Sequence, residues 1–291
     1  MRIEGRTHMR PVIEKELLHY DILFALDSAG LLDLLTFQGG TSLRLCYGAP
    51  RFSEDLDFTG GKHFISADLL AIKHCIETYI GARYGLEVIV KDPKQLALEF
   101  GNEDLKVDKW QITVITSSDR RDIPRQKIKI EVVNIPSYSR TPQPIKLNYD
   151  FLPDGYKDTL IMVESLDEIY ADKCISLVNS QKYIRHRDIW DLRWLKQEGA
   201  MINADFIRDK IQDYRITDYL AKLDIMVSRL DEIIYSPSFR QEMSRFIPLD
   251  TQERTLAKDK FYAFLLTEVK SILIKVKQML QGTNKDEPFF I

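Results

Sequence analysis

The stretch FQGGTSLRLCYGAPRFSEDLDF, residues 37–58, contains the pattern that decides the fold of this chain. Its two ends have the composition of short strands, and between them lie a glycine turn, a helix start and a loop. Asp55 and Asp57 are two residues apart on the second strand, so their side chains lie on one face. Leu56 and Phe58 then face a core. Neighbouring carboxylates repel each other, and a cation between them relieves that repulsion.

The residue types around this carboxylate pair indicate a metal and phosphate site. Carboxylate oxygens are hard ligands that favour Mg²⁺ or Mn²⁺. Gly39 and Gly40 permit close backbone approach, and Thr41 is of a type that caps helices. Backbone N–H groups at a helix start bind phosphate. The combination predicts phosphoryl or nucleotidyl transfer; the alternative is an exposed acidic hairpin after a glycine turn.

A third carboxylate is expected from a later strand. In KIKIEV, residues 127–132, charged and apolar residues alternate as on a half-buried strand. If that strand lies beside Asp55 and Asp57, Glu131 completes a metal triad and helps take a proton from an attacking hydroxyl. The alternative is that Glu131 is an exposed residue paired with Lys129 or with a neighbouring strand.

Composition limits the class of protein. The 291 residues can form one large domain or two ordinary ones, and 44% hydrophobic with 29% charged residues is typical of soluble globular proteins. The sequence has no apolar run long enough to predict a membrane span, and the N-terminus has no apolar core of the kind expected in a secretory signal. The three scattered cysteines fit a reducing cytoplasm. A net charge of −3 means that nucleic-acid binding would need a local basic face.

The periodicity of apolar residues predicts an α+β chain: a mixed sheet with flanking helices in residues 1–150, then an all-α half in residues 151–291 that completes the cleft. Helices are expected at 10–30 and 66–83, the second capped by Ser66, and strands at 86–90, 96–100, 110–115 and 128–133. Four prolines in residues 135–158 predict an irregular crossover. Further helices are expected at 165–180, 187–198, 203–214, 217–234, 238–246 and 251–280.

The same residues resemble a known family. A G-G turn followed by a D-x-D strand is similar to the nucleotidyltransferase superfamily that includes polymerase beta. The fuller pattern, with Arg44, Arg51 and Ser53 in place, resembles the AbiEii family, the nucleotidyltransferase-like toxins of abortive-infection and toxin–antitoxin pairs. The resemblance covers roughly residues 37–195. The family more often has aspartate at the position of Glu131, which is a departure.

Residues 164–195 resemble the later motifs of that family, a helix with D-K followed by R-D-x-x-D-L. The resemblance implies that Lys173 contacts the nucleotide phosphates and that Asp188 and Asp191 form or hold the site. The alternative is that the two aspartates, three apart on one helix face, only stabilise the start of their helix. Trp190 and Trp194, four apart, favour a core role over base stacking.

The resulting site hypothesis has three parts. The nucleotide would be an NTP, and the metal would be Mg²⁺ or Mn²⁺ held by Asp55, Asp57 and Glu131. The expected catalytic residues are Asp55, Asp57, Glu131, Lys173, Asp188 and Asp191. The expected nucleotide-binding residues are Gly39, Gly40, Thr41, Ser42, Arg44, Ser53 and Lys173.

The leading functional hypothesis is a cytoplasmic toxin that transfers NMP from an NTP to an acceptor hydroxyl. The resemblance points to RNA as acceptor, with the 3′ end of tRNA expected, and to a cognate antitoxin, with no membrane partner. Basic residues of the helical half would grip the RNA, or else form an ordinary solvated face: Lys182, Arg185, Arg187, Arg193, Lys196, Lys258, Lys260, Lys270, Lys275 and Lys277. Two other hypotheses are a transferase for a small-molecule or protein hydroxyl, and a non-catalytic partner-binding protein on the same fold.

Overall fold

The computed structural model describes residues 9–93, 96–97, 105–115, 125–180 and 183–282. The chain divides into two compact units, one of Met1–Ser165 with Arg245–Pro248 and one of Leu166–Ser244 with Leu249–Ile291. The division expected after residue 150 lies further along in the structure. The reason is that a strand at Leu160–Glu164 pairs into the sheet of the first unit and so belongs to it.

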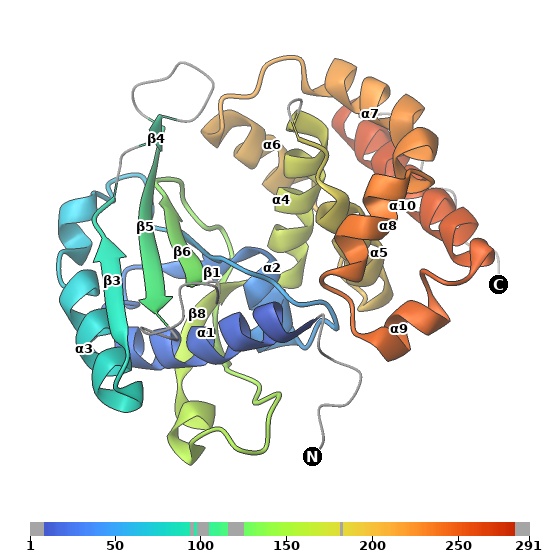
Figure 1. The fold of residues 1–291 in the computed structure, drawn as a ribbon. Helices are drawn as coiled ribbons and strands as arrows, with labels where there is room; N and C mark the ends of the chain where they lie inside the picture. The colour runs from blue at the N-terminus through green and yellow to red at the C-terminus, as the bar shows by residue number, and fades with distance from the viewer. Residues whose placement is uncertain (1–8, 94–95, 98–104, 116–124, 181–182, 283–291) are drawn as a thin grey trace. The chain divides into compact units, whose positions relative to one another are not determined.

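The first unit is built on a mixed sheet of eight strands among the described residues (Figure 1). The order is β3-β5-β6-β2-β1-β8-β7, with β4 paired to β5; β2–β6 and β1–β8 are parallel, and the other pairs are antiparallel. The strands are β1 Thr36–Gln38, β2 Leu56–Thr59, β3 Glu87–Lys91, β4 Leu96–Ala97, β5 Lys106–Ile115, β6 Gln126–Val133, β7 Arg140–Pro144 and β8 Leu160–Glu164.

Two helices, α1 (Arg10–Ser28) and α3 (Ile72–Tyr84), cover the apolar face of this sheet. Their buried side chains form one core with alternate residues of the strands, among them Leu56 on β2, Ile130 on β6 and Trp110 on β5. Since neighbouring residues on a strand point to opposite faces, the residues between these core positions lie on the other face. The short elements are α2 (Gly39–Ser42), a π-helix (Leu43–Tyr47) and 3₁₀ turns at Ser66–Leu69 and Asp154–Asp158.

The predicted irregular crossover contains regular structure. Pro142 and Pro144 lie within β7, and residues 154–158 form a 3₁₀ turn. Proline is compatible with a strand only where its missing N–H is not needed, and β7 is the last strand in the order. The prediction of an irregular crossover was therefore wrong for residues 140–144, which form an edge strand.

Two predicted helix limits were wrong. Ser66 does not cap a helix that begins there, because the Asp68 carboxylate accepts from the Ile65 N–H at 3.1 Å and closes a 3₁₀ turn before α3. The single helix expected at 251–280 is divided into α9 (Leu249–Arg254) and α10 (Asp259–Leu280). Lys258 between them has an extended backbone.

The second unit is helical throughout its described residues, as predicted. Besides α9 and α10 it contains α4 (Leu166–Asn179), α5 (His186–Gln197), α6 (Ala204–Asp213), α7 (Tyr219–Ile234) and α8 (Pro237–Ser244). Trp190 and Trp194 are buried, which confirms their predicted core role. Among the helices of the described residues, none combines the length and apolar composition needed to span a bilayer.

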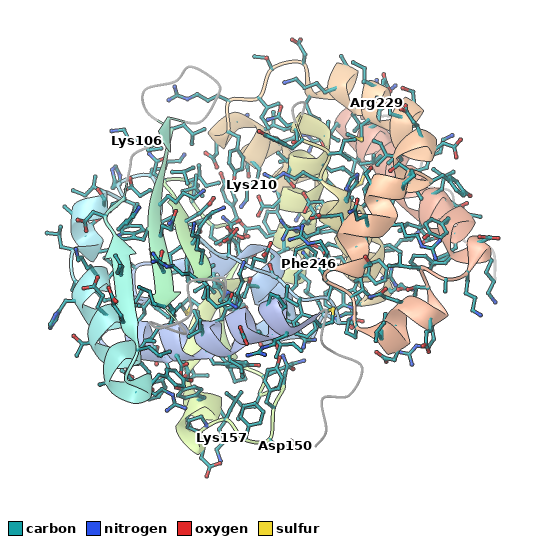
Figure 2. All side chains as sticks on the ribbon, viewed as in Figure 1. Lys106, Asp150, Lys157, Lys210, Arg229 and Phe246 are labelled. Atoms are coloured by element: carbon teal, nitrogen blue, oxygen red, sulfur yellow. The ribbon has the colours of Figure 1, made fainter. Side chains whose placement is uncertain are left out.

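A buried ion cluster around Lys210, which is labelled in Figure 2, joins α4 to α6 inside this unit. Lys210 Nζ lies 2.8 Å from Glu168 Oε1 and 3.1 Å from Asp172 Oδ2, and the lysine and Glu168 have no exposed surface. An ammonium enclosed in this way compensates carboxylates that would be expensive to bury alone.

We therefore predict that Lys210→Met destabilises the second unit by about 3–5 kcal/mol, because a buried carboxylate loses its cation. Urea unfolding followed by tryptophan fluorescence measures this, since Trp190 and Trp194 lie in that unit. Lys270→Met, at an exposed lysine of α10, is the matched control and should change stability by less than about 0.5 kcal/mol. Equal midpoints for the two variants would show that the cluster contributes little.

Candidate active site

A row of polar residues crosses four strands on the face of the sheet opposite the core. Gln38 on β1 is in register with Asp57 on β2, Asp57 with Glu131 on β6, and Glu131 with Lys109 on β5. Asp55 precedes Asp57 by two residues and lies on the same face. The structure thus places Asp57 and Glu131 in register on one face of the sheet, with Asp55 directly before β2.

Two lysines neutralise this row. Lys109 Nζ forms an ion pair with the Glu131 carboxylate. Lys129 Nζ lies 3.8 Å from Asp55 Oδ2, and the Lys129 backbone N–H donates to Asp55 Oδ1 at 3.3 Å. Glu131 therefore pairs with a neighbouring strand, as the alternative to the metal triad expected, and it is also in register with Asp57.

The ionisation of Asp55 reflects this crowding. Burial raises the pKa of Asp55 above its ordinary value, Lys129 opposes the increase, and Glu131 and Glu54 add to it. When neighbours disfavour the negative charge of a carboxylate, a further cation nearby stabilises the ionised form.

The donor chemistry fits a hard divalent cation. Among the described residues no group of three or more His, Cys, Asp or Glu side chains is arranged to hold a metal ion. The oxygen ligands are nevertheless those that Mg²⁺ and Mn²⁺ prefer. In this structure the ammonium groups of Lys129 and Lys109 supply the positive charge beside Asp55 and Glu131.

The two glycines of the motif are required for different reasons. Gly39 has φ +77°, and a Cβ built on it would lie 2.7 Å from Asp57 Oδ2. A Cβ on Gly40 would lie 2.9 Å from Ser53 Oγ and would also meet the Arg51 guanidinium. The Gly-Gly turn therefore approaches the carboxylate strand closely on one side and the preceding loop on the other.

The hydroxyl groups of the turn have partners within the protein. Thr41 lies inside α2 and does not cap it, because Gln38 occupies the N-cap position. The Thr41 hydroxyl donates to the Asp55 carbonyl and joins the turn to the start of β2. The Ser42 hydroxyl donates to the Gly39 carbonyl at 2.9 Å. Both residues stabilise the turn that the sequence assigned to nucleotide binding.

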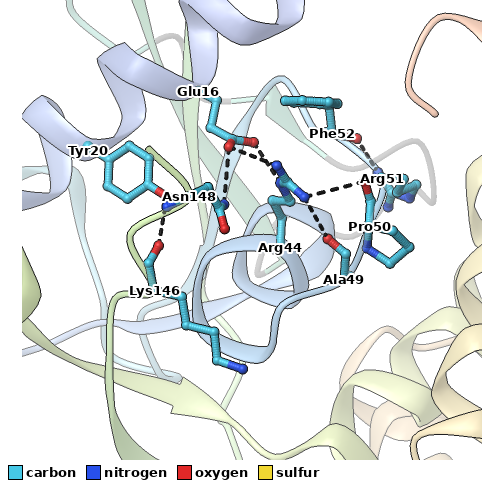
Figure 3. Close-up of polar contacts among 9 residues, drawn as sticks. All are labelled: Glu16, Tyr20, Arg44, Ala49, Pro50, Arg51, Phe52, Lys146 and Asn148. Atoms are coloured by element: carbon cyan, nitrogen blue, oxygen red, sulfur yellow. Dashed lines mark hydrogen bonds and ion pairs between the residues drawn. The ribbon is translucent and has the colours of Figure 1, made fainter. Parts of the chain in front are cut away.

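Arg44, which was predicted to bind nucleotide, lies in a structural network (Figure 3). Its guanidinium donates to both Glu16 oxygens, at 2.8 and 3.1 Å, and to the carbonyls of Ala49 and Pro50. Asn148 Nδ2 also donates to Glu16. The arginine holds the loop that leads from the π-helix to the aspartates.

A second charged group lies within the helical unit. Lys173 on α4 contacts Asp188 Oδ1 at 2.7 Å and Asp191 Oδ2 at 3.1 Å, both on α5. The Ser176 hydroxyl donates to Asp188 Oδ2 at 2.6 Å. The structure joins the three residues that the second sequence motif singled out, and the aspartates hold the lysine rather than merely charging a helix start.

Asp188 is strongly held in its ionised form. Burial alone would raise the pKa of Asp188, but the Lys173 ammonium, Arg185 and the hydrogen bonds from Lys173 and Ser176 lower it to about 2.

Many of the basic residues expected to bind RNA are already engaged. Arg193 is buried with its guanidinium 4.4 Å from the centre of the Trp190 ring, so it is not available to an RNA phosphate. Ion pairs join Arg187 to Glu242, Lys196 to Glu268 and Lys277 to Asp224. Lys258, Lys260, Lys270 and Lys275 are exposed, and Lys182 lies outside the described residues.

Sequence reasoning missed Lys109, and it missed that Lys129 contacts Asp55. Lys109 contacts Glu131 only because β5 and β6 pair in one particular register, which no local pattern encodes. Lys129 is two residues from Glu131 on the same strand, so the period of two already placed Lys129 on the carboxylate face.

A mixed sheet in which a Gly-Gly turn contacts a D-x-D strand, with a third carboxylate on the adjacent parallel strand, defines a nucleotidyltransferase. The family model for the nucleotidyl transferase AbiEii toxin of type IV toxin–antitoxin systems matches residues 21–265. The chain belongs to this AbiEii family. No protein in the curated set matches the sequence.

Solved structures agree on the fold. The chain is similar to MenT4, a nucleotidyltransferase toxin from Mycobacterium tuberculosis H37Rv, with a TM-score of 0.55, 15% identity, and coverage of 98% of this chain and 92% of that one. It is also similar to a putative nucleotidyltransferase from H. pylori, with a TM-score of 0.50, 17% identity, and coverage of 94% and 97%.

The low pKa of Asp188 predicts a specific loss of stability in acid. A carboxylate whose pKa falls from 3.8 to about 2 on folding stabilises the fold by about 2 kcal/mol above the higher value, and this contribution disappears as the pH falls to the lower one. Urea midpoints measured from about pH 5 to about pH 2 should show this loss in the native chain and a smaller one in Asp188→Asn. Asp250→Asn, at an exposed ion pair, should follow the native curve. Parallel curves for all three would contradict the assignment.

Proposed function

We propose that this toxin is a metal-dependent enzyme that transfers a nucleoside monophosphate from an NTP to a hydroxyl of RNA, with the 3′ end of tRNA as the expected acceptor. The observation that supports it best is the in-register pair Asp57–Glu131, with Asp55 on the same face and Gly39 against Asp57. In the reaction the acceptor oxygen bonds to the α-phosphorus. The bond from that phosphorus to the bridging oxygen breaks, and pyrophosphate leaves.

The metal would be Mg²⁺ or Mn²⁺, held by Asp55 and Asp57 with Glu131 as the third ligand. When bound, such ions activate the attacking oxygen and neutralise charge on the triphosphate and leaving group. Glu131 is the group assigned to accept the proton of the acceptor hydroxyl. Gly39 places no side chain against Asp57, and Gly40 places none against Ser53 and Arg51, which leaves the turn backbone close to the carboxylate strand.

For the helical unit we propose that Lys173 contacts the nucleotide phosphates. Its two ion pairs fix the position of the ammonium, so Asp188 and Asp191 act as positioning residues. A lysine that approaches phosphate from a fixed position loses little side-chain entropy on binding.

The family supports the proposed partner, and the exposed lysines support the proposed acceptor. A type IV toxin–antitoxin system implies a cognate antitoxin and an NTP substrate. The basic residues that we propose for RNA contacts are the exposed ones, Lys258, Lys260, Lys270 and Lys275. A small-molecule hydroxyl is the other outcome that the test below distinguishes.

The test is transfer of label to RNA. The purified protein is incubated with total RNA, Mg²⁺ and each α-labelled NTP separately, and the products are separated by size. We expect one NTP to label RNA of tRNA length, and Asp57→Asn to reduce labelling by more than about 100-fold because a metal ligand is lost. Asp150→Asn, at an exposed residue of the same unit, is the control and should label normally. Full activity in Asp57→Asn, or label only on small hydroxyl compounds, would contradict the proposal.

The role of Lys173 needs a variant that keeps the net charge of the buried group. Lys173→Met with Asp188→Asn removes one positive and one negative charge together, so the net charge of the group is unchanged. We expect the double variant to fold and its KM for the NTP to rise by about tenfold relative to Asp188→Asn alone. An unchanged KM in a folded double variant would show that Lys173 is only structural.

A further inference from the structure

Lys109 is a charged residue of the site that the proposed reaction does not yet use. It lies on β5 opposite Glu131, and its ammonium pairs with the carboxylate that the metal hypothesis needs as a third ligand. Trp110 beside it is buried in the core, so β5 cannot shift register without exposing that ring. The strand pairing therefore keeps Lys109 within reach of Glu131.

The lysine and a metal ion would compete for the same oxygens. Asp55, Asp57 and Glu131 carry three negative charges. Lys109 and Lys129 add two positive charges beside them, so little net negative charge remains to attract a metal cation. Lys109 Nζ contacts Glu131 Oε1, so a metal ion at that oxygen would have to displace the lysine.

The ion pair of Lys109 and Glu131 can be broken at low cost, so that the lysine moves to another anion. Their side chains are 27% and 29% exposed, and an ion pair this accessible to water contributes little to folding stability. Lysine also has a flexible stem and a point charge, so it can leave one anion for another at low cost. A buried, bidentate arginine in the same place would not exchange in this way.

We propose that Lys109 is a positioning residue that occupies Glu131 in the nucleotide-free protein and yields it to the metal that enters with the NTP. The proposal rests on the metal site proposed above. In the free protein the lysine weakens the binding of a divalent cation alone. Once Glu131 turns to the metal, the Lys109 ammonium is released at the edge of the site, where it can pair with an anionic oxygen of the nucleotide.

The experiment measures Mn²⁺ binding directly, by electron paramagnetic resonance of the free ion at fixed salt and pH, without nucleotide. Lys109→Met should bind Mn²⁺ roughly three- to tenfold more tightly than the native chain, because a competing charge is gone. Lys109→Arg should stay close to the native value or bind more weakly. Lys106→Met is the matched control, because it lies on the same strand, makes the same change in charge and is exposed (Figure 2).

A double-variant cycle separates an action through Glu131 from a general charge effect. If Lys109 acts by occupying Glu131, then Lys109→Met should tighten Mn²⁺ binding much less in a Glu131→Gln chain than in the native chain. An equal gain in both backgrounds, or the same gain from Lys106→Met, would overturn the proposal.

The outcomes also separate this inference from the proposed function. Native-like Mn²⁺ affinity in Lys109→Met, together with weaker binding in Asp57→Asn, would reject the role of Lys109 and leave the metal site standing. If neither the native chain nor Lys109→Met binds Mn²⁺, both the metal site and the proposed role of Lys109 are rejected.

Discussion

The parallel pairing of β2 with β6 is the constraint on which the candidate site depends. Leu56 and Ile130 meet on the apolar face of the sheet, so Asp57 and Glu131 must meet on the opposite face. Because side chains alternate with a period of two, a slip of one residue would bury a carboxylate and expose a core side chain. The hydrophobic core beneath the sheet therefore fixes the geometry of the charges above it, and the carboxylates of the candidate site do not have to stabilise their own arrangement.

Local patterns were sufficient for much of this arrangement. The spacing of Asp55 and Asp57 gave their common face, alternation in residues 127–132 gave the face of Glu131, and apolar periodicity gave the helices of the second unit. Pairings between distant strands were not encoded locally. The ion pair of Lys109 depends on the β5–β6 register, and the prolines of β7 indicated a loop because only the completed sheet shows that they lie on an edge.

The predicted roles of arginine and lysine show a second limit of sequence reasoning. Arg44 and Arg193 have the residue type that binds phosphate, but one is held by Glu16 and the other is buried against Trp190. Charge type indicates what a residue can bind, whereas burial and existing partners decide whether it is available. Lys173 has the charge that binds phosphate, but it is buried like Arg193, and its two carboxylate partners fix it and reduce the positive charge that a phosphate would meet.

The prolines of β7 have a consequence for how the protein associates with other chains. An open sheet edge presents unpaired N–H and C=O groups, on which a strand of another molecule can add. Pro142 and Pro144 each remove one N–H from this edge, so β7 is a poor template for strand addition and for edge-to-edge aggregation. A strand added at β7 would lack the hydrogen bonds of two N–H groups, so the sheet tends to end there rather than continue into another molecule.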